Sequence, residues 1–212
     1  DDLIIKVNGV STIVSETPFD MVEIDLNASG CDISDEIDYQ YSITSNPITY
    51  AEYTEFLIHL LENDSDQISS ENGNINGYYA GDENFEPGYY LFYSDDDNPS
   101  IIWNGTTFIV SEGEGNLTAK RITWFGAQSF AEYYSLRLPT ANELKKANNI
   151  IGSIGKEWIY DWATNSSTEW YLENGYELWE ADVQCTIDGC NILSGGRLID
   201  PDEMNGIRCV LN

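Results

Sequence analysis

The feature that most constrains the fold is the stretch Arg121–Ala147, which reads RITWFGAQSFAEYYSLRLPTANELKKA. Thr123 is a predicted helix N-cap, because its hydroxyl can accept a free backbone N–H of the first turn. Apolar residues follow at helical spacing, and Pro139 should end the run because it disfavours helical backbone in the residue before it. Thr140 and Glu143 then form a T-x-x-E capping box, which marks the start of another helix. The stretch therefore predicts a helix, a short extended segment and a second helix.

A further helix is predicted over Thr49–Glu62, where Thr49 and Glu52 form another capping box and an apolar helical stripe follows. We expect this helix and a helix over Thr123–Tyr134 to pack on a small twisted antiparallel sheet. The segment from Glu62 to Glu86 is rich in Asn, Asp, Ser and Gly, a composition typical of loops. Short strands are expected at Phe19–Leu26, Tyr39–Ile43, Gly88–Tyr93 and Gly206–Val210.

Asn-Gly pairs between β-branched runs predict hairpins, because both central positions of a type I′ turn need a positive φ. An Asp-Gly pair predicts a turn for the same reason. The pairs are Asn8-Gly9 between Leu3–Val7 and Val10–Val14, Asn104-Gly105 between Ile101–Trp103 and Thr106–Val110, Asn174-Gly175, and Asp188-Gly189.

The formal net charge of -28, from 37 acidic and 9 basic residues, limits the partners that the chain can have. Such a field repels phosphate backbones and anionic lipids, so the composition argues against nucleic acid as a partner. No apolar run reaches transmembrane length, so we expect no membrane insertion. A hydrophobic fraction of 42% over 212 residues is enough for one folded domain, which we expect to span residues 1–212.

Four cysteines leave two alternatives open, disulfide bonds or free thiols. Cys185 and Cys190 would close a small loop, because only T-I-D-G lies between them. Cys31 would meet Cys209 if the two ends of the chain are adjacent. Neither bond is needed to replace a core in a chain of this length.

A family resemblance lies on the stretch described first. Its motif residues are Ile122, Trp124, Ala127, Phe130 and Tyr134, then Arg137 to Thr140, Glu143, Leu144 and Ala147. They resemble the core of the formylglycine-generating-enzyme/sulfatase-modifying-factor family, whose members typically read V-x-W-x-x-A-x-x-[FY]-x-x-W and then R-L-P-T-E-A-E-W-E-x-A. Weaker matches follow in the family's order and include Glu157-Trp158, Gly195-Gly196 and the G-I-R-C-V ending at Gly206–Val210.

The resemblance implies an α+β domain, a variant of the C-type lectin fold with two main helices on small twisted antiparallel sheets. The hairpin at residues 1–15 lies ahead of the family's usual start, so we expect an appendage or a contact to a neighbouring chain. The core is expected to contain Trp124, Trp158, Trp162, Phe130 and Leu138.

One function that the resemblance implies is a copper-dependent oxidase like the formylglycine-generating enzymes, which hold copper with two cysteines after the double glycine. Cys185 and Cys190 have the family's separation, but they precede Gly195-Gly196 and lack the surrounding histidine, tyrosine and arginine residues. The segment after the double glycine is also too short for the family's active site. His59 is the only histidine, and we expect it to be a packed or surface residue, which leaves no base for a Ser-His-Asp triad.

Asp95, Asp96 and Asp97 are weak calcium candidates, because clustered oxygen ligands suit this hard cation. They do not follow the EF-hand spacing, so a solvated acidic turn and no bound cofactor are expected. A lectin-like surface domain with a fixed sugar or calcium ligand remains an alternative.

The resemblance favours a binding protein over an enzyme. Variable proteins of diversity-generating retroelements use C-type-lectin scaffolds as display surfaces and place variable residues before a closing G-[FIV]-R-x-V strand. Residues from about 158 to 212 have that ending and are rich in Tyr, Asn, Asp and Ser, which dominate antibody paratopes. We expect a non-enzymatic protein at an extracellular, virion or cell surface that binds a protein or glycan receptor. The candidate variable positions, expected to be exposed on one face, are Tyr171, Asn174, Tyr176, Asp182, Thr186, Asp188, Asn191, Arg197, Asp200 and Asp202.

Overall fold

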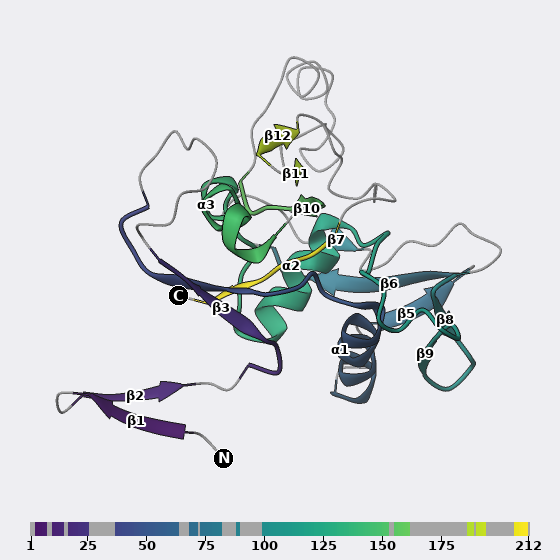
Figure 1. Ribbon diagram of the computed structural model, residues 1–212. Coiled ribbons are helices and arrows are strands. Elements are labelled where there is room, and N and C mark those ends of the chain that lie inside the picture. The colour runs from purple at the N-terminus through teal and green to yellow at the C-terminus, as the bar shows by residue number, and fades with distance from the viewer. Residues whose placement is uncertain are drawn as a thin grey trace.

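Three helices and a set of short antiparallel strands make up the described part of the chain in the computed structural model (Figure 1). The helices are α1 (Tyr50–Asn63), α2 (Trp124–Tyr133) and α3 (Ala141–Ile151). The architecture is therefore α+β, as the sequence predicts. The structure describes residues 3–7, 10–14, 17–25, 37–63, 68–71, 73–81, 88–89, 99–152, 155–161, 186–188, 190–193 and 206–211.

The named strands of the described residues pair with one another in antiparallel fashion and form small separate sheets, and an isolated parallel bridge joins Glu157 of β10 to Gly206. One sheet has the order β13-β4-β3, another β5-β6-β7 and a third β10-β11-β12, while β1-β2 and β8-β9 are two-stranded. The bounds are β1 (Leu3–Val7), β2 (Val10–Val14), β3 (Met21–Ile24), β4 (Tyr41–Thr44), β5 (Ile68–Glu71), β6 (Asn74–Tyr79), β7 (Gly88–Tyr89), β8 (Ile101–Trp103), β9 (Phe108–Val110), β10 (Lys156–Trp158), β11 (Thr186–Asp188), β12 (Asn191–Leu193) and β13 (Val210–Leu211).

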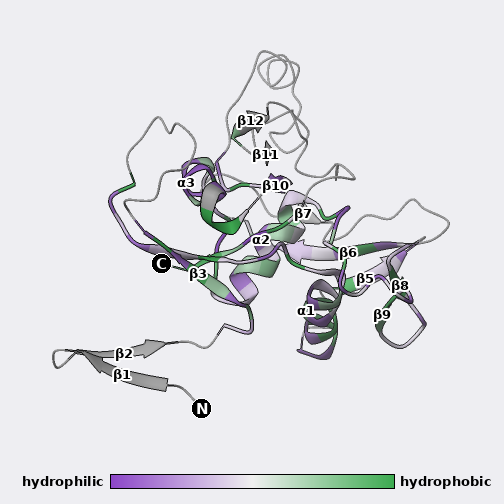
Figure 2. Ribbon diagram, viewed as in Figure 1, coloured by the Kyte–Doolittle hydropathy of each residue, from purple (hydrophilic) through white to green (hydrophobic). Residues whose placement is uncertain are grey.

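The larger core lies around α1 and α2, and Phe130 is at its centre. Its ring packs against Phe19, Tyr53 and Phe56 at centroid distances of 5.4–5.6 Å. Figure 2 shows hydrophobic residues along α2 and along the C-terminal end of the chain. The predicted core residues Trp124, Phe130, Leu138 and Trp158 are all fully buried, and Trp162 lies outside the described residues.

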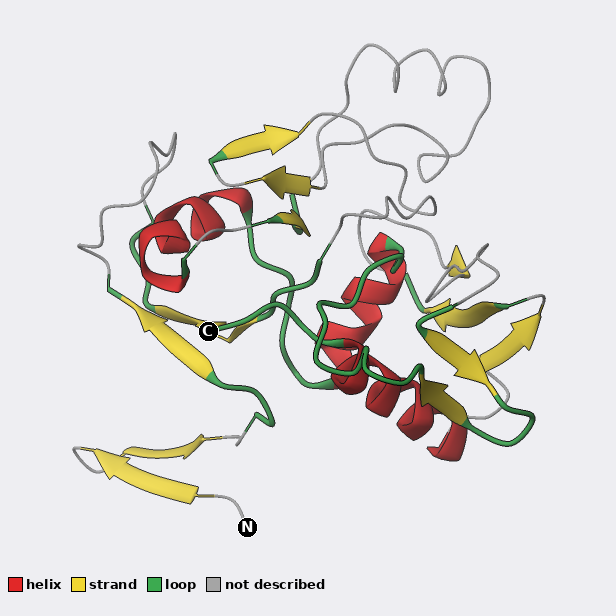
Figure 3. Cartoon of the chain, turned by 45° about the vertical axis from the view of Figure 1, so that its right-hand side comes forward, coloured by secondary structure: helices red, strands yellow, loops and turns green. Residues whose placement is uncertain are grey.

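A smaller core lies between α3 and the sheet β13-β4-β3 (Figure 3). Leu144 of α3 is buried there with Tyr41 and Ile43 of β4 and with Val210 of β13. Thus α3, which follows the R-L-P-T motif, covers the sheet that the C-terminal strand completes. The first two helices instead contact the hairpins, α1 at β5 and β9 and α2 at β6.

The capping predictions are confirmed at each helix. Thr123 accepts a hydrogen bond from Gly126 N at 3.0 Å, and Thr140 forms the full capping box with Glu143. At α1 the Glu52 carboxylate accepts from Thr49 N at 2.7 Å, while Thr49 Oγ1 accepts from Glu52 N at 3.3 Å.

The predicted role of Pro139 in ending α2 is wrong. The helix already ends at Tyr133, and Ser135 then has a φ of 57°, the left-handed conformation that closes helix C-termini. Leu136 N donates to Ala131 O at 2.8 Å across this turn, which satisfies one of the last carbonyls.

Two hairpin predictions need correction. The predicted loop from Glu62 to Glu86 contains the hairpin of β5 and β6, in which Glu71 pairs with Asn74 and Gly73 has a φ of 84°. The hairpin of β8 and β9 exists, but Thr106 and Thr107 belong to its turn, since the last pair is Trp103 with Phe108. Asn104 lacks the positive φ of a type I′ turn, because its side-chain oxygen instead accepts from the backbone N–H groups of Thr106 and Thr107.

The N-terminal hairpin has the predicted strands, β1 and β2, paired from Leu3 with Val14 to Val7 with Val10. It forms a sheet of its own, which lies beside the rest of the chain in Figure 1. Within the described residues, none of the helices combines the length and the apolar character that crossing a membrane requires.

Candidate functional site

The C-terminal third contributes the sheet β10-β11-β12, which carries three of the candidate variable positions. Asp188 pairs directly with Asn191, and Thr186 lies two residues before Asp188 on the same strand. Residues that pair directly or lie two apart share one face of a strand ladder. The backbone register therefore places Thr186, Asp188 and Asn191 on one face of the hairpin, in its strands and not in its turn. Leu193 and, on β10, Lys156 and Trp158 share that face.

The other candidate positions lie outside the described residues. They are Tyr171, Asn174, Tyr176, Asp182, Arg197, Asp200 and Asp202. The calcium candidates Asp95, Asp96 and Asp97 lie outside the described residues too, as do the Asn174-Gly175 turn and Gly195-Gly196. The predicted exposure of the whole set stays a prediction.

Two buried tryptophans attach β10 to the helical core. Trp158 Nε1 donates to Ile122 O at 2.8 Å, and Trp124 Nε1 donates to Ile159 O at 2.9 Å. Each indole thus bonds to the backbone beside the other, and both rings are fully buried. The reciprocal bonds fix β10 against the start of α2, so the hairpin of β11 and β12 extends from a rigid strand.

A buried ion pair fixes the same strand to the end of the chain. Arg208 Nε donates to Glu157 Oε1 at 3.0 Å, and both side chains are almost fully buried. Arg208 Nη1 also donates to the carbonyls of Thr44 at 2.9 Å and Ser45 at 2.7 Å. The pair therefore joins β10, the segment before β13 and the end of β4.

The Glu157 carboxyl is an unusual acid in this setting. Its Oε2 is buried and has no hydrogen-bond partner within the described residues. Burial raises the pKa of Glu157 to about 7, because desolvation disfavours the charged form more than Arg208 stabilises it. The sequence interpretation missed this pair, although its two members stand in the E-W and G-I-R-C-V motifs.

A second buried carboxylate, Glu143, lies at the R-L-P-T motif. Arg137 donates from both terminal nitrogens to the two oxygens of Glu143, and Tyr39 and Thr140 N add bonds of 2.9 Å and 2.7 Å. Burial by itself would raise the pKa of Glu143, but the bonds from Arg137 and Thr140 outweigh it and lower that pKa. The capping box was predicted, whereas the role of Arg137 was not.

A comparison with protein families matches residues 35–189 to the sulfatase-modifying factor enzyme 1-like domain. The chain belongs to this family. No curated protein sequence matches the chain significantly. The match covers both of the capping boxes described above and β10 and β11, while Arg208, the partner of Glu157, follows it.

The structure decides between the open alternatives for two of the cysteines, Cys190 and Cys209. Cys209 is a free, buried thiol, so of the two alternatives the structure supports the free thiol at this position and not a bond to Cys31. Burial raises the pKa of Cys209, and the nearby carboxylates of Glu52 and Glu157 raise it further. Cys190 is disulfide-bonded, and the other predicted partner, Cys185, lies outside the described residues.

The single histidine lies on the surface of α1. His59 Nε2 is 3.8 Å from Glu55 Oε1, and its ring stacks on Tyr133 at a centroid distance of 6.0 Å. The interpretation as a packed or surface residue agrees with this position, although the neighbouring carboxylate of Glu55 was not anticipated. Across the described ranges, no three His, Cys, Asp or Glu side chains are grouped so that they could hold a metal ion.

Proposed function

We propose that the chain is a non-enzymatic ligand-binding protein with a C-type lectin fold, the variable protein of a diversity-generating retroelement. It binds a protein or glycan receptor through its C-terminal third, at an extracellular, virion or cell surface. The sulfatase-modifying-factor-like domain supports this proposal only in part, because oxidases and variable proteins share that domain.

The observation that carries the proposal is the contrast between β10 and the hairpin attached to it. Trp158 and Glu157 of β10 are buried and bonded to the core, as a fixed framework requires. The register brings the candidate positions Thr186, Asp188 and Asn191 to one face of the neighbouring strands. A fixed strand beside strands that carry polar candidate positions is the arrangement expected of a scaffold that tolerates variation.

The genetic code supports the same division. Adenine-directed mutation of AAC or AAT codons can give Asn, Asp, Ser, Thr and Tyr, but it cannot give Trp. The buried Trp158 is therefore compatible with a fixed framework position, whereas Thr186, Asp188 and Asn191 are residue types that such codons reach.

The genomic DNA tests the proposal directly. We expect a reverse-transcriptase gene near this one, together with a near-copy of the 3′ end of the gene that differs from it at adenines. Differences confined to other bases, or the absence of such a near-copy, would refute the retroelement assignment.

A stability comparison tests the surface itself. We expect the triple variant Thr186→Ala, Asp188→Ala, Asn191→Ala to change the free energy of unfolding by no more than about 0.5 kcal/mol per site. The matched control is Ile187→Ala, Ile192→Ala, which alters the directly paired residues of the opposite face. We expect this control to lose about 2–5 kcal/mol per isoleucine, as the truncation of a core side chain does. Equal losses in denaturant titrations of the two variants would contradict the proposal.

Copper titration separates this function from the oxidase alternative. We expect no stoichiometric Cu(I) site at Cys185 and Cys190 and no oxidation of a cysteine-containing sulfatase peptide. One-to-one copper binding with turnover of the peptide would establish the enzyme instead.

A further inference from the structure

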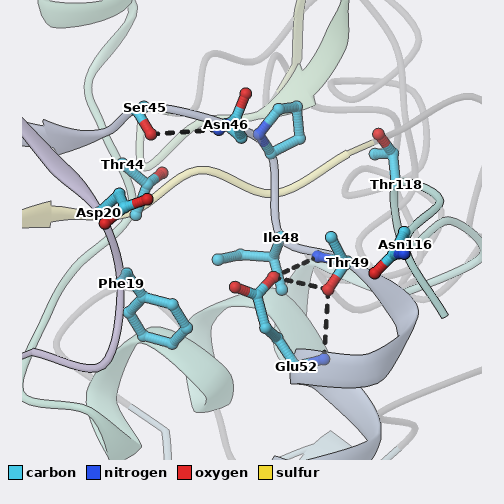
Figure 4. Close-up of a pocket in the computed structure, with 11 residues that line it drawn as sticks. Phe19, Asp20, Thr44, Ser45, Asn46, Ile48, Thr49, Glu52, Asn116 and Thr118 are labelled. Atoms are coloured by element: carbon cyan, nitrogen blue, oxygen red, sulfur yellow. Dashed lines mark hydrogen bonds between the residues drawn. The ribbon is translucent and has the colours of Figure 1, made fainter.

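A cavity of about 350 Å³ lies where three segments of the chain meet (Figure 4). Phe19 and Asp20 come from the segment before β3, and the residues from Thr44 to Glu52 run from the end of β4 into α1. Asn116 and Thr118 complete the lining from the segment that leads to α2. The volume is within the usual range for pockets that bind small organic ligands.

The walls of this cavity are held in place by hydrogen bonds of the backbone and of residues behind the lining. Ser45 N donates to Asp20 O at 2.9 Å, and Tyr50 N donates to Leu117 O at 3.0 Å. Behind the wall, Arg208 donates to the Thr44 and Ser45 carbonyls, and Cys209 N donates to Thr44 Oγ1. The cavity is therefore preformed, which lowers the entropic cost of binding.

The polar atoms of the lining leave unused acceptors. Thr49 occupies only Oε2 of the Glu52 carboxylate, so Oε1 has no hydrogen-bond donor among the described residues. The carboxylate of Asp20 and the side-chain amide of Asn116 make no hydrogen bond within the same part of the chain. No lysine or arginine is among the described residues that line the cavity, so its charge is negative.

We propose that this cavity binds a primary ammonium group on a short alkyl chain, as in the side chain of a lysine. The ammonium has three donors and no acceptor, which matches the free oxygens of Glu52, Asp20 and Asn116. The alkyl stem matches the apolar part of the lining, Phe19, Pro47 and Ile48. An anion is disfavoured by the two carboxylates, and a bare divalent ion would leave most of the 350 Å³ unfilled.

This site shares no residue with the proposed receptor-binding face. Its lining comes from residues before α2, whereas the candidate variable positions all follow α3. A retroelement that varies the C-terminal third would leave it unchanged. The inference does not depend on the proposed function, and either can fail without the other.

The test uses the whole chain labelled with ¹⁵N and two blocked amino acids, N-acetyl-lysine methylamide and N-acetyl-norleucine methylamide. The second probe keeps the alkyl chain and lacks the ammonium group. We expect saturable shifts of the Ser45, Thr49, Glu52 and Thr118 amide signals with the lysine probe and none with the norleucine probe. Equal shifts with both probes, or no saturable shift with either, would overturn the inference.

Asp20→Asn removes one charge from the lining, and because Asp20 is exposed we expect the fold to persist. It should weaken binding of the lysine probe about fivefold. The matched control is Glu23→Gln, which removes the same charge from an exposed position of β3 outside the cavity lining. An equal effect of the control would mean that the net charge of -28 attracts the probe without a site.

A second variant, Thr118→Val, keeps the shape and the charge of the lining and should weaken binding less than Asp20→Asn does. Calcium chloride at matched ionic strength tests the other class of cation. Displacement of the lysine probe by calcium, with larger shifts of the same amides, would identify a metal site and contradict the proposal.

Discussion

Two buried carboxylates, Glu143 and Glu157, each face an arginine, yet their environments shift the two pKa values in opposite directions. Both oxygens of Glu143 accept hydrogen bonds, from Arg137, Tyr39 and Thr140 N. Glu157 accepts one bond through Oε1 from Arg208, and its Oε2 has no partner among the described residues. The pKa of Glu143 is lowered, and that of Glu157 is raised to about 7.

The difference shows that one bond from an arginine leaves the pKa of a buried carboxyl raised, whereas several donors lower it. Desolvation is the largest influence on both groups, and the number of donors decides whether it is overcome. The Glu143 pair lies at the R-L-P-T motif and caps α3, whereas the Glu157 pair joins β10 to the end of the chain. The less satisfied pair therefore supports the strand from which the candidate receptor-binding face extends.

The largest expected effect comes from Arg208→Met, which removes the only donor to Glu157 among the described residues. It also frees the Thr44 and Ser45 carbonyls, and we expect a loss of about 3–5 kcal/mol in the free energy of unfolding. Arg137→Met should cost less, about 1–3 kcal/mol, because Glu143 keeps Tyr39 and Thr140 N as donors. Denaturant titrations above neutral pH measure both, and Lys145→Met, at a half-buried lysine of α3, serves as the control. A larger loss at Arg137 would reverse the comparison.

The stability contributions of the two carboxylates should depend on pH in opposite directions, which is the next largest expected effect. The raised pKa of Glu157 means that the folded state binds more protons than the unfolded chain between the ordinary glutamate pKa of about 4.3 and about 7. The contribution of Glu157 is therefore complete at low pH and is lost as the pH rises through about 7. For Glu143, whose pKa is lowered, the contribution is present at neutral pH and is lost as the pH falls through its folded pKa.

The measurement is the free energy of unfolding of the wild type minus that of Glu157→Gln, taken at about pH 5 and about pH 8. We expect this difference to fall by about 2 kcal/mol from the lower to the higher pH. The subtraction removes the contribution of the other acids. A difference that rises with pH would show that Arg208 keeps Glu157 charged in the folded protein.

Thr140→Ala tests how much the capping box of α3 contributes beside the pair of Arg137 and Glu143. The substitution removes the hydroxyl that accepts from Glu143 N and leaves Thr140 N as a donor to the carboxylate. We expect a loss of about 1 kcal/mol in thermal or denaturant unfolding. The pKa of Glu143, followed by NMR of its carboxyl carbon, should stay below its ordinary range, and a rise to that range would assign the lowered pKa to the cap.

Tyr39→Phe should have the smallest effect on stability. Tyr39 is 42% exposed, and the substitution removes only one of the donors to Glu143. We expect a loss of about 0.5 kcal/mol and a small rise of the Glu143 pKa. An unchanged pKa in the same NMR titration would show that Arg137 and Thr140 N are sufficient.

Local signals predicted the helices well. Thr49, Thr123 and Thr140 each lie directly before a helix, because an N-cap depends on a hydroxyl and the next three residues. The C-terminal end of α2 was predicted less well, since Ser135 adopts a left-handed conformation that its residue type does not indicate. The hairpin of β5 and β6 was missed because its polar composition resembles a loop, although Asn72-Gly73 lies between its strands.

The site was predicted only as positions along the sequence. The Asp188-Gly189 pair predicted a turn, but the partner strand β10 comes from contacts between segments far apart in the chain. The same limit applies to Glu157 and Arg208, which are 51 residues apart and meet only in the folded protein. The cavity of Figure 4 also combines segments whose own patterns carry no sign of it.

The bridge between Glu157 and Gly206 has a consequence for the length of the chain between them. Gly206 N donates to Lys156 O at 2.7 Å, and Trp158 N donates to Gly206 O at 3.0 Å. These bonds hold the two ends of the intervening segment together whatever its length. Because doubling the length of a closed loop adds only about 0.6 kcal/mol to the entropic cost of closing it, the bridge should tolerate insertions and deletions between its two ends. Variants of this scaffold can therefore differ in the length as well as in the side chains of this segment, while the bridge between Glu157 and Gly206 is kept.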